Sequence, residues 1–267
     1  MNVIGILVCY YPSNKDKSSE IFKNILNKVS RKNKMIIVNN KKLIASKFSN
    51  EEIISNNTGW EFGAWDLGLE HISSSVCDDD IIILANDTFC FNRVFTSFDS
   101  WLFSNAFKKI KKNTGFLVGE KCALEKAFEL NGYATDSWIS TYLFGMSYST
   151  LQHVSPLHNA LFNSFDVIDF DEKKVRIPAA SSFLNQHLSQ WLFPMYGQHG
   201  WYKARDGVVN KNLWCAKLHA IYNEKILSVN VCKKGGELYD VYGNVTMKTI
   251  SKVFRKLLKL IKGNHYG

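Results

Sequence analysis

Short apolar runs alternate with segments of helical spacing over the first ninety residues. Val3–Tyr10, Met35–Val38 and Ile81–Ala85 are nearly continuous apolar runs, a pattern typical of strands buried on both faces. Between them, apolar residues recur every three or four positions in Ser18–Val29 and Trp65–Ile72, which predicts helices. The order predicts βαβ units and a parallel sheet covered by helices.

The alternation becomes less regular after residue 92. An aromatic-rich helix is expected over Phe95–Ile110 and another helix over Ser182–Leu192, with strand segments at Thr114–Val118 and Leu143–Met146. Glu51–Ile54 fits a short strand or a turn. The chain has four prolines and no Gly/Ser-rich tract, so we expect one α/β domain over residues 1–243 with a mixed sheet.

Residues 244–267 form a separate basic tail in this interpretation. Met247–Lys262 carries six cations and no acid, and its apolar residues recur at helical spacing. Such a helix fits the headgroup layer of an anionic membrane, where each cation contributes about 1 kcal/mol. The other interpretation is a terminal helix that packs the same apolar face onto the domain. We expect membrane contact, because no acid balances the basic face.

Composition narrows the classes of protein. The 267 residues are 46% hydrophobic and carry a formal charge of +9, enough for a sizeable core and an excess of positive charge. No apolar run approaches the roughly 20 residues that cross a bilayer, and Met1–Tyr11 lacks the features of a signal peptide, so a cytoplasmic location is expected. Six scattered cysteines predict neither a disulfide framework nor a zinc site. No sequence signature favours nucleic acid as a partner.

Polar clusters follow the predicted strands. Tyr10-Tyr11, Asn39-Asn40, the loop Asn56–Gly63 and Asn86-Asp87-Thr88 all stand at predicted carboxyl ends, where open α/β sheets bind ligands. We therefore expect one ligand-binding rim. In the loop, Gly59 and Gly63 allow a close backbone approach to a bulky ligand, and Glu61 and Asp66 add carboxylates beside it.

These motifs carry a resemblance to a known family. The segments ILVCYYP, IIVNN, NNTGWEFGAWDLGLEHI and IIILANDT resemble the GT-A glycosyltransferases of bacterial polysaccharide synthesis. The Trp60–Ala64 loop and the strand end Ala85–Thr88 are similar to motifs of the rhamnan synthesis protein F family. Looser similarity extends to Ser137–Leu143 and Asn210–Lys233. The resemblance implies a GT-A, Rossmann-like domain for nucleotide sugars with a C-terminal helical extension.

The resemblance also implies roles for the residues at the rim. Leaving-group charge on a diphosphate needs a divalent metal or fixed cations, and Asp87 is the candidate ligand for Mg²⁺ or Mn²⁺ or for the diphosphate. The triplet has one carboxylate where relatives have Asp-x-Asp, and a turn cap is the structural alternative for Asp87. Candidate donor-binding residues are Tyr10, Tyr11, Asn39, Gly59, Glu61, Gly63, Asp66, Asn86 and Thr88. Among them, Asn39 stands where relatives bind the pyrimidine. Trp60, Trp65 and Trp138 are candidate sugar platforms.

The general base has two candidates in the sequence. His187 stands on the helix near which inverting relatives place a carboxylate, and Asp136 precedes the mid-chain segment. The expected activity is transfer of rhamnose or another hexose from a nucleotide sugar to a polyprenyl-diphosphate-linked O-antigen or capsule glycan, at the inner face of the cell membrane. The alternatives are a catalytically impaired sugar-nucleotide-binding partner of a synthase complex and, ranked lower, a basic nucleic-acid-binding protein.

Overall fold

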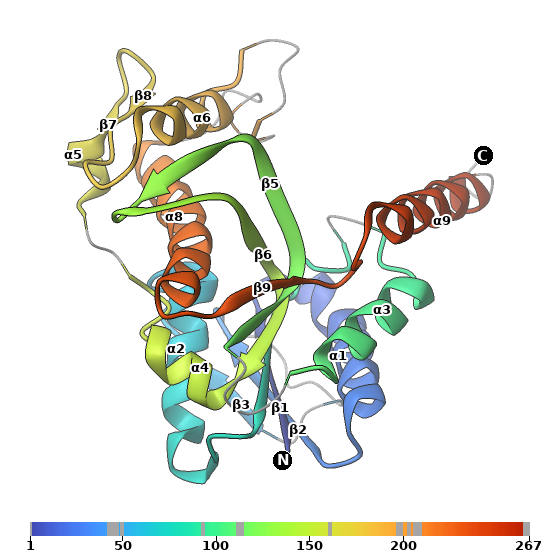
Figure 1. Ribbon diagram of the computed structural model, residues 1–267. Helices are drawn as coiled ribbons and strands as arrows, with labels where there is room; N and C mark the ends of the chain where they lie inside the picture. The colour runs from blue at the N-terminus through green and yellow to red at the C-terminus, as the bar shows by residue number, and fades with distance from the viewer. Residues whose placement is uncertain are drawn as a thin grey trace.

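Seven strands form one mixed sheet in the order β3-β2-β1-β4-β6-β5-β9 (Figure 1). The computed structural model describes residues 2–41, 48, 51–91, 94–110, 115–159, 162–195, 200–201, 204 and 210–263. Strands β1 (Val3–Cys9), β2 (Asn33–Asn39), β3 (Glu51–Ile54) and β4 (Ile81–Asn86) run parallel. Strand β6 (Tyr133–Ser147) pairs antiparallel to β4, and β5 (Phe116–Leu130) pairs with β6 and with β9 (Glu237–Asp240).

Helices cover both faces of the sheet (Figure 1). Helices α1 (Pro12–Val29) and α3 (Ser97–Phe107) share one apolar core with the inward side chains of β1 and β4. Helices α2 (Trp60–Ile72), α4 (Tyr148–Val154) and α8 (Lys211–Lys233) share another core on the opposite face. Every residue of β1 is buried, as expected for a strand covered on both sides.

The hairpin of β5 and β6 extends beyond the main sheet. Its tip, Asn131-Gly132, has positive φ at both residues, which is the geometry of a type I′ turn. The outer part of the hairpin packs against a smaller layer through Phe128 and Leu130. This layer contains α5 (Ser164–Val167), the short strands β7 (Ile168–Asp169) and β8 (Lys174–Val175), and α6 (Ser182–Leu192).

The prediction of an α/β fold with a mixed sheet is confirmed. Several boundaries differ from the predicted ones, and three of the differences have physical reasons. Helix α1 begins six residues earlier than Ser18, because Pro12 suits the first helical position. Strand β6 begins ten residues before Leu143, because its outer half has polar positions that carry no continuous apolar run. Strand β5 is longer than expected for the same reason, and its predicted first residue, 114, lies outside the described residues.

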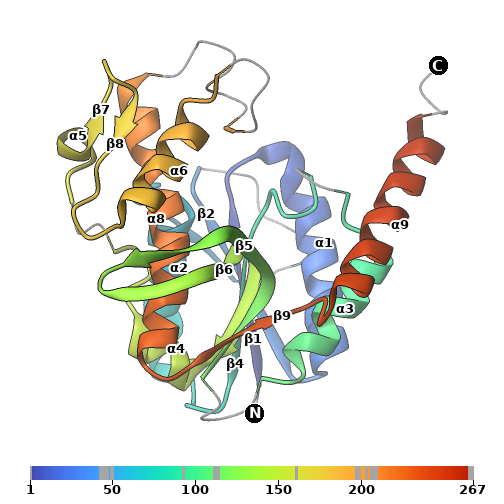
Figure 2. The ribbon, with the colours of Figure 1, turned by 45° about the horizontal axis from the view of Figure 1, so that its top comes forward.

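The C-terminal helix α9 (Val245–Gly263) lies beside α3 and then projects from the body (Figures 1 and 2). A polar contact joins it to α3: Asp99 Oδ1 accepts hydrogen bonds from Ser251 Oγ at 2.6 Å and from Arg255 Nη2 at 2.8 Å. Most apolar residues of α9 are not covered by this contact, and Val253, Phe254 and Leu257 are about half exposed. Within the described part of the chain, no helix is long and apolar enough to cross a membrane.

Candidate functional site

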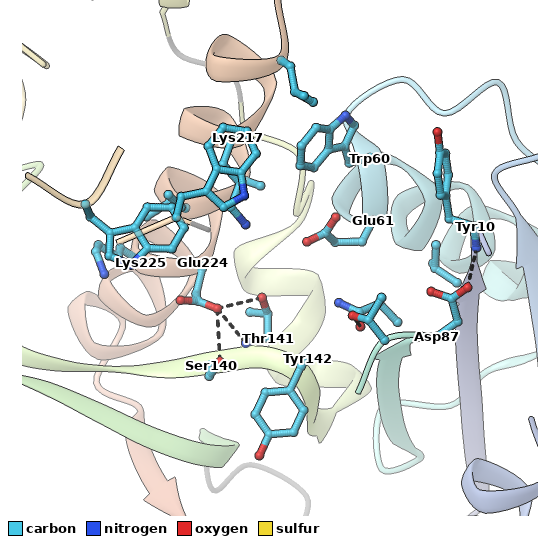
Figure 3. Close-up of a pocket in the computed structure, with 18 of the residues that line it drawn as sticks. Tyr10, Trp60, Glu61, Asp87, Ser140, Thr141, Tyr142, Lys217, Glu224 and Lys225 are labelled. Carbon is cyan, nitrogen blue, oxygen red and sulfur yellow. Dashed lines mark hydrogen bonds between the residues drawn. The ribbon is translucent and has the colours of Figure 1, made fainter. Parts of the chain in front are cut away.

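A cavity of about 590 Å³ opens where the parallel strands end (Figure 3). One side consists of residues that follow β1, β2 and β4, together with the start of α2. The other side consists of β6, α6 and α8. Its lining residues include Tyr10, Tyr11, Asn40, Trp60, Glu61, Asn86, Asp87, Thr88, Trp138, Thr141, His187, Trp191, Trp201, Lys217, Glu224 and Lys225. The predicted convergence of polar strand ends is therefore present: each of the four clusters lines the cavity in full or in part.

Asp87 ties the end of β4 to the end of β1. Its Oδ2 accepts hydrogen bonds from the backbone N–H groups of Tyr10 at 2.8 Å and Tyr11 at 2.7 Å, and the residue is only 2% exposed. Burial raises the pKa of Asp87 to about 6, despite the two N–H donors, and the nearby Glu61 raises it further. Asp87 thus fastens the turn before α1 while it lines the cavity.

The neighbours of Asp87 complete this wall. Thr88 Oγ1 donates to Asn86 Oδ1 at 2.7 Å, and both residues line the cavity. The rings of Tyr10 and Tyr11 meet edge to face with their centroids 5.0 Å apart, and Tyr11 is 38% exposed. The structure therefore brings these four predicted residues together around Asp87.

Asn39 and Asn40 differ from the sequence expectation. Asn39 does not line the cavity: it is buried, and its Nδ2 donates to Glu52 Oε2 at 2.7 Å. Asn40 lines the cavity instead. Its Nδ2 donates to the carbonyl oxygen of Trp60 at 3.2 Å, and its buried Oδ1 has no hydrogen-bond partner among the described residues. The amide that faces a ligand is therefore the one after Asn39, because β2 ends with Asn39 turned toward Glu52.

The two predicted loop glycines have structural roles. A Cβ atom on Gly63 would lie 2.0 Å from the carbonyl oxygen of Thr58, and Gly59 has a φ of 71° with the ring of His158 2.7 Å from its Cβ position. Neither glycine lines the cavity. The expectation that they allow a ligand to approach the backbone is therefore not supported by their placement. Trp60, which follows Gly59 and adopts a φ of 54°, is the residue of this turn that lines the cavity together with Asn57.

Glu61 lies between the two sides of the cavity. In Figure 3 it stands between Asp87 and Glu224, with Trp60 above it. Burial raises the pKa of Glu61, Lys217 opposes this rise, and Glu224 adds to it. Among the described residues, no other side chain forms a hydrogen bond with its carboxylate. Glu61 is therefore a cavity carboxylate that remains available to a ligand.

The opposite wall contains three functional candidates that the sequence pattern did not reveal. Glu224 on α8 accepts hydrogen bonds from Trp138 Nε1 at 2.7 Å and from the backbone N–H of Thr141 at 2.9 Å, which fixes α8 against β6 (Figure 3). Lys225 is 2% exposed with its Nζ 3.2 Å from the centroid of the Trp138 ring, and burial lowers its pKa to about 8. Lys217 lines the cavity two turns earlier on the same helix.

These residues were missed because α8 has no simple amphipathic pattern. Polar Asn223, Glu224 and Lys225 follow one another in a helix whose other polar residues are scattered along its length, and Asn223 and Lys225 are buried. The sequence shows three consecutive polar residues, but their burial follows from the contacts of α8 with β6, which local pattern does not predict.

Of three other predicted site residues, His187, Asp66 and Asp136, one lines the cavity and two do not. His187 on α6 lines the cavity, and burial, with a smaller effect of Lys225, lowers its pKa. Asp66 lies in a second, shallower hollow, where its carboxylate accepts the N–H groups of Leu157 and His158 at 2.7 and 2.8 Å. Asp136 is exposed on β6 and does not line the cavity. The placement of Asp66 and Asp136 does not support the ligand-binding and catalytic roles expected for them.

The predicted tryptophan platforms also separate. Trp60 and Trp138 line the cavity, whereas Trp65 is fully buried in the core and donates from Nε1 to the carbonyl oxygen of Ala85 at 3.1 Å. Trp191 and Trp201 join the lining from the region of α6. Three of the four lining tryptophans, Trp138, Trp191 and Trp201, therefore lie on the side away from Asp87.

A divalent cation would have few protein ligands here. Among the described residues, no group of three or more His, Cys, Asp or Glu side chains is placed to hold a metal. The N–H groups of Tyr10 and Tyr11 occupy Oδ2 of Asp87, which leaves Oδ1 as its oxygen for a cation. One carboxylate oxygen fits Mg²⁺ or Mn²⁺ when waters and substrate phosphates complete the coordination.

No protein-family model matches the chain, and no curated protein matches it significantly. The assignment of a function therefore depends on the geometry of the cavity and on the motifs that line it.

Proposed function

We propose that this protein is a glycosyltransferase that moves a sugar, rhamnose or another hexose, from a nucleotide-sugar donor to a lipid-linked O-antigen or capsule glycan. The observation that carries the proposal is one cavity with two chemically different sides. A polar side at the strand ends surrounds Asp87, and an aromatic side lies between β6, α6 and α8. Two substrates with different chemistry fit such a division.

The strand-end side suits the nucleotide. Tyr10 and Tyr11 offer aromatic surfaces at the rim, and the unpartnered Oδ1 of Asn40 offers an acceptor for an N–H group of a base. Asp87 offers a carboxylate oxygen for a cation on the diphosphate. When bound, that cation would offset the negative charge on the departing diphosphate.

The turn before α1 argues against a dinucleotide bound in the usual Rossmann manner. That manner places phosphate on free backbone N–H groups at a helix N-terminus. Here Pro12 has no N–H, and the N–H groups of Tyr10 and Tyr11 already bind Asp87. Two N–H groups that could hold a pyrophosphate at this turn are therefore occupied, and the residue after them has none.

The aromatic side suits a carbohydrate acceptor. The rings of Trp138, Trp191 and Trp201 provide flat apolar surfaces, and sugars present apolar C–H faces. Trp60 adds another flat surface from the start of α2 on the strand-end side. Glu224 holds Trp138 and Thr141 in place through hydrogen bonds to both of its carboxylate oxygens. This rigid wall would orient a glycan against the donor.

Glu61 is the group best placed to act as general base. It lies between the two sides, and its carboxylate is not held by another described side chain, whereas Glu224 already accepts several hydrogen bonds. In the proposed step, Glu61 takes the proton of the acceptor hydroxyl while the acceptor oxygen bonds to the anomeric carbon. The bond from that carbon to the diphosphate oxygen breaks, and the electron pair leaves with the nucleoside diphosphate. This direct displacement inverts the anomeric configuration.

The proposed place of action is the inner face of the cell membrane, with the protein bound peripherally. A polyprenyl-diphosphate-linked acceptor is confined to that surface, and the cationic α9 is supported as a contact by its charge and by its exposed apolar residues.

A second candidate function is a sugar-nucleotide-binding partner of a synthase complex without transferase activity of its own. The single carboxylate of Asn86-Asp87-Thr88 favours it, because one ligand contributes less to metal binding than two.

Turnover separates the two candidates. The purified chain should release nucleoside diphosphate from one member of a panel of nucleotide sugars when a short glycan acceptor is added. Glu61→Gln should lower this release at least 100-fold while donor affinity changes little, and Glu70→Gln, exposed on the same helix, should have no effect. Donor binding with no release in the wild-type chain would favour the partner function.

A further inference from the structure

Helix α9 exposes an apolar stripe, although the helix is attached to the body. Helical spacing places Ile250, Val253, Phe254 and Leu257 on one stripe, and these side chains are 36%, 49%, 47% and 51% exposed. Leu260 extends the stripe and is 68% exposed. Terminal helices normally bury such a stripe against the domain. Here it is left open along most of the helix.

A polar contact explains why the stripe stays open. The side of α9 that faces α3 presents Ser251, 1% exposed, and Arg255, and both bind Asp99. Arg255 also donates to the hydroxyl of Tyr242, so the contact includes the segment before the helix. Ser251 and Arg255 hold the polar side of the helix against α3, and the stripe touches α3 through the ring of Phe254. The attachment therefore fixes the helix while most of its stripe stays uncovered.

Helix α3 extends the apolar surface. The ring of Phe98 stacks on Phe254 at 5.5 Å and on Trp101 at 5.8 Å between centroids, which makes a continuous aromatic row from α9 to α3. Trp101 is 50% exposed. An exposed tryptophan beside an apolar stripe is typical of the membrane interface, where its ring lies at headgroup level. Figure 2 shows the two helices side by side.

The charge of α9 selects one kind of partner. Val245–Gly263 contains six lysines and arginines and no acid. Lys252 and Lys256 are exposed and lie beside the stripe rather than on it. Arg255 is committed to Asp99, so it belongs to the attachment and not to the free basic surface. An apolar stripe flanked by cations complements an anionic lipid surface, whereas a second copy would bring the same cations together.

We propose that the stripe of α9 and Trp101 of α3 together form a membrane-docking face that inserts into the headgroup layer of an anionic bilayer. The inference deepens the proposed function, since it names the surface through which the enzyme would reach a lipid-linked acceptor. Because Asp99 and Arg255 fix α9 to the body, docking also sets the orientation of the domain on the membrane.

Sedimentation with vesicles tests the docking face in the full chain. Vesicles of 30% phosphatidylglycerol in phosphatidylcholine should pellet the wild type, and vesicles of phosphatidylcholine alone should retain much less of it. Lys252→Glu with Lys256→Glu should lower the apparent affinity by tenfold or more. Leu257→Ser with Trp101→Ala should also lower it, since both changes remove inserted surface. The control pair Lys32→Glu with Lys126→Glu makes the same charge change at exposed sites away from α9. It should lower the affinity for the vesicles much less than the Lys252 and Lys256 changes do.

Three results would overturn the proposal. Equal sedimentation of the wild type and the Lys252/Lys256 variant would exclude an electrostatic docking face. Equal loss in the control pair would show that net charge alone drives the binding. A wild type that is dimeric by light scattering, becomes monomeric with Leu257→Ser and does not pellet would make the stripe a self-association surface. Binding of nucleotide sugar, measured without vesicles, is separate from all three, so failure of docking and failure of the glycosyltransferase proposal are distinguishable.

Discussion

Asp87 Oδ2 accepts a hydrogen bond from the backbone N–H of Tyr11 at 2.7 Å. This bond joins Asp87, the candidate ligand for the cation or the diphosphate, to the residue that precedes α1. The same carboxylate also accepts from Tyr10. A residue expected from the sequence either to bind the donor or to cap a turn has a place that suits both roles. Substitutions at this position must therefore separate chemistry from folding.

Asp87→Asn should abolish transfer while the protein remains folded. Asparagine keeps an oxygen that can accept from Tyr10 and Tyr11 but loses the charge that a cation requires. Asp87→Ala should lose transfer and also lower the free energy of unfolding by about 1–3 kcal/mol, because two buried N–H groups lose their acceptor. Product formation and melting temperature should be measured together. Near-normal turnover in a folded Asp87→Asn variant would remove Asp87 from the mechanism.

Donor binding should weaken as the pH falls through about 6. Burial raises the pKa of Asp87 to about 6, so its charge is lost there. The raised pKa means that the folded state binds this proton more tightly than the unfolded chain. Between about pH 4 and 6, protonation of Asp87 therefore favours folding, and the loss of binding is not unfolding caused by this group. Calorimetric titration between pH 5 and 8 measures the effect, and a flat profile would contradict it.

Gly63→Ala should destabilise the fold rather than act on the donor. The new Cβ would meet the carbonyl oxygen of Thr58 at 2.0 Å, and such overpacking costs about 1–3 kcal/mol. Glu70→Ala, exposed on the same helix, serves as the control in thermal unfolding. An unchanged melting temperature with weaker donor binding would return Gly63 to the ligand-contact role that the sequence suggests.

Lys225→Met should change how stability depends on pH. Burial lowers the pKa of Lys225 to about 8, so between about pH 8 and 10.5 the unfolded chain binds more protons at this residue than the folded state does. The wild type should therefore gain about 2 kcal/mol of stability from pH 8 to 10 relative to the variant. Urea unfolding of both proteins at several pH values measures the difference. Parallel pH profiles would show that Lys225 is not desolvated in solution.

Much of the fold could be predicted because its first half has a strong pattern. The apolar runs that form β1, β2 and β4 are continuous, and the polar residues at their ends point to Asp87, Asn86 and Thr88 from the sequence alone. The hairpin of β5 and β6 was only partly predicted, although Asn131-Gly132 is a strong signal for a type I′ turn. Its outer strands alternate irregularly because two bulges interrupt the pairing.

The second wall of the site could not be predicted from local pattern. Glu224 and Lys225 reach the cavity through long-range contacts with Trp138 and Thr141, more than eighty residues earlier. Asn39 and Asn40 are adjacent, and a one-residue difference in where β2 ends decides which amide faces the cavity. Loop glycines present a related difficulty, because a backbone contact such as that between Gly63 and Thr58 has the same sequence signature as a ligand contact.

Thermal unfolding of the wild type and of Asp87→Asn with a panel of nucleotide sugars tests directly whether this protein binds a nucleotide-sugar donor at Asp87. A donor that binds only the folded state should stabilise the wild type by about 2.7 kcal/mol at 100 times its dissociation constant, and should stabilise Asp87→Asn much less. At least one nucleotide sugar should behave in this way, and the matching free sugar should not. Failure of every nucleotide sugar to stabilise the wild type, while a short oligonucleotide does so in a salt-dependent manner, would contradict the glycosyltransferase proposal and favour a nucleic-acid-binding protein.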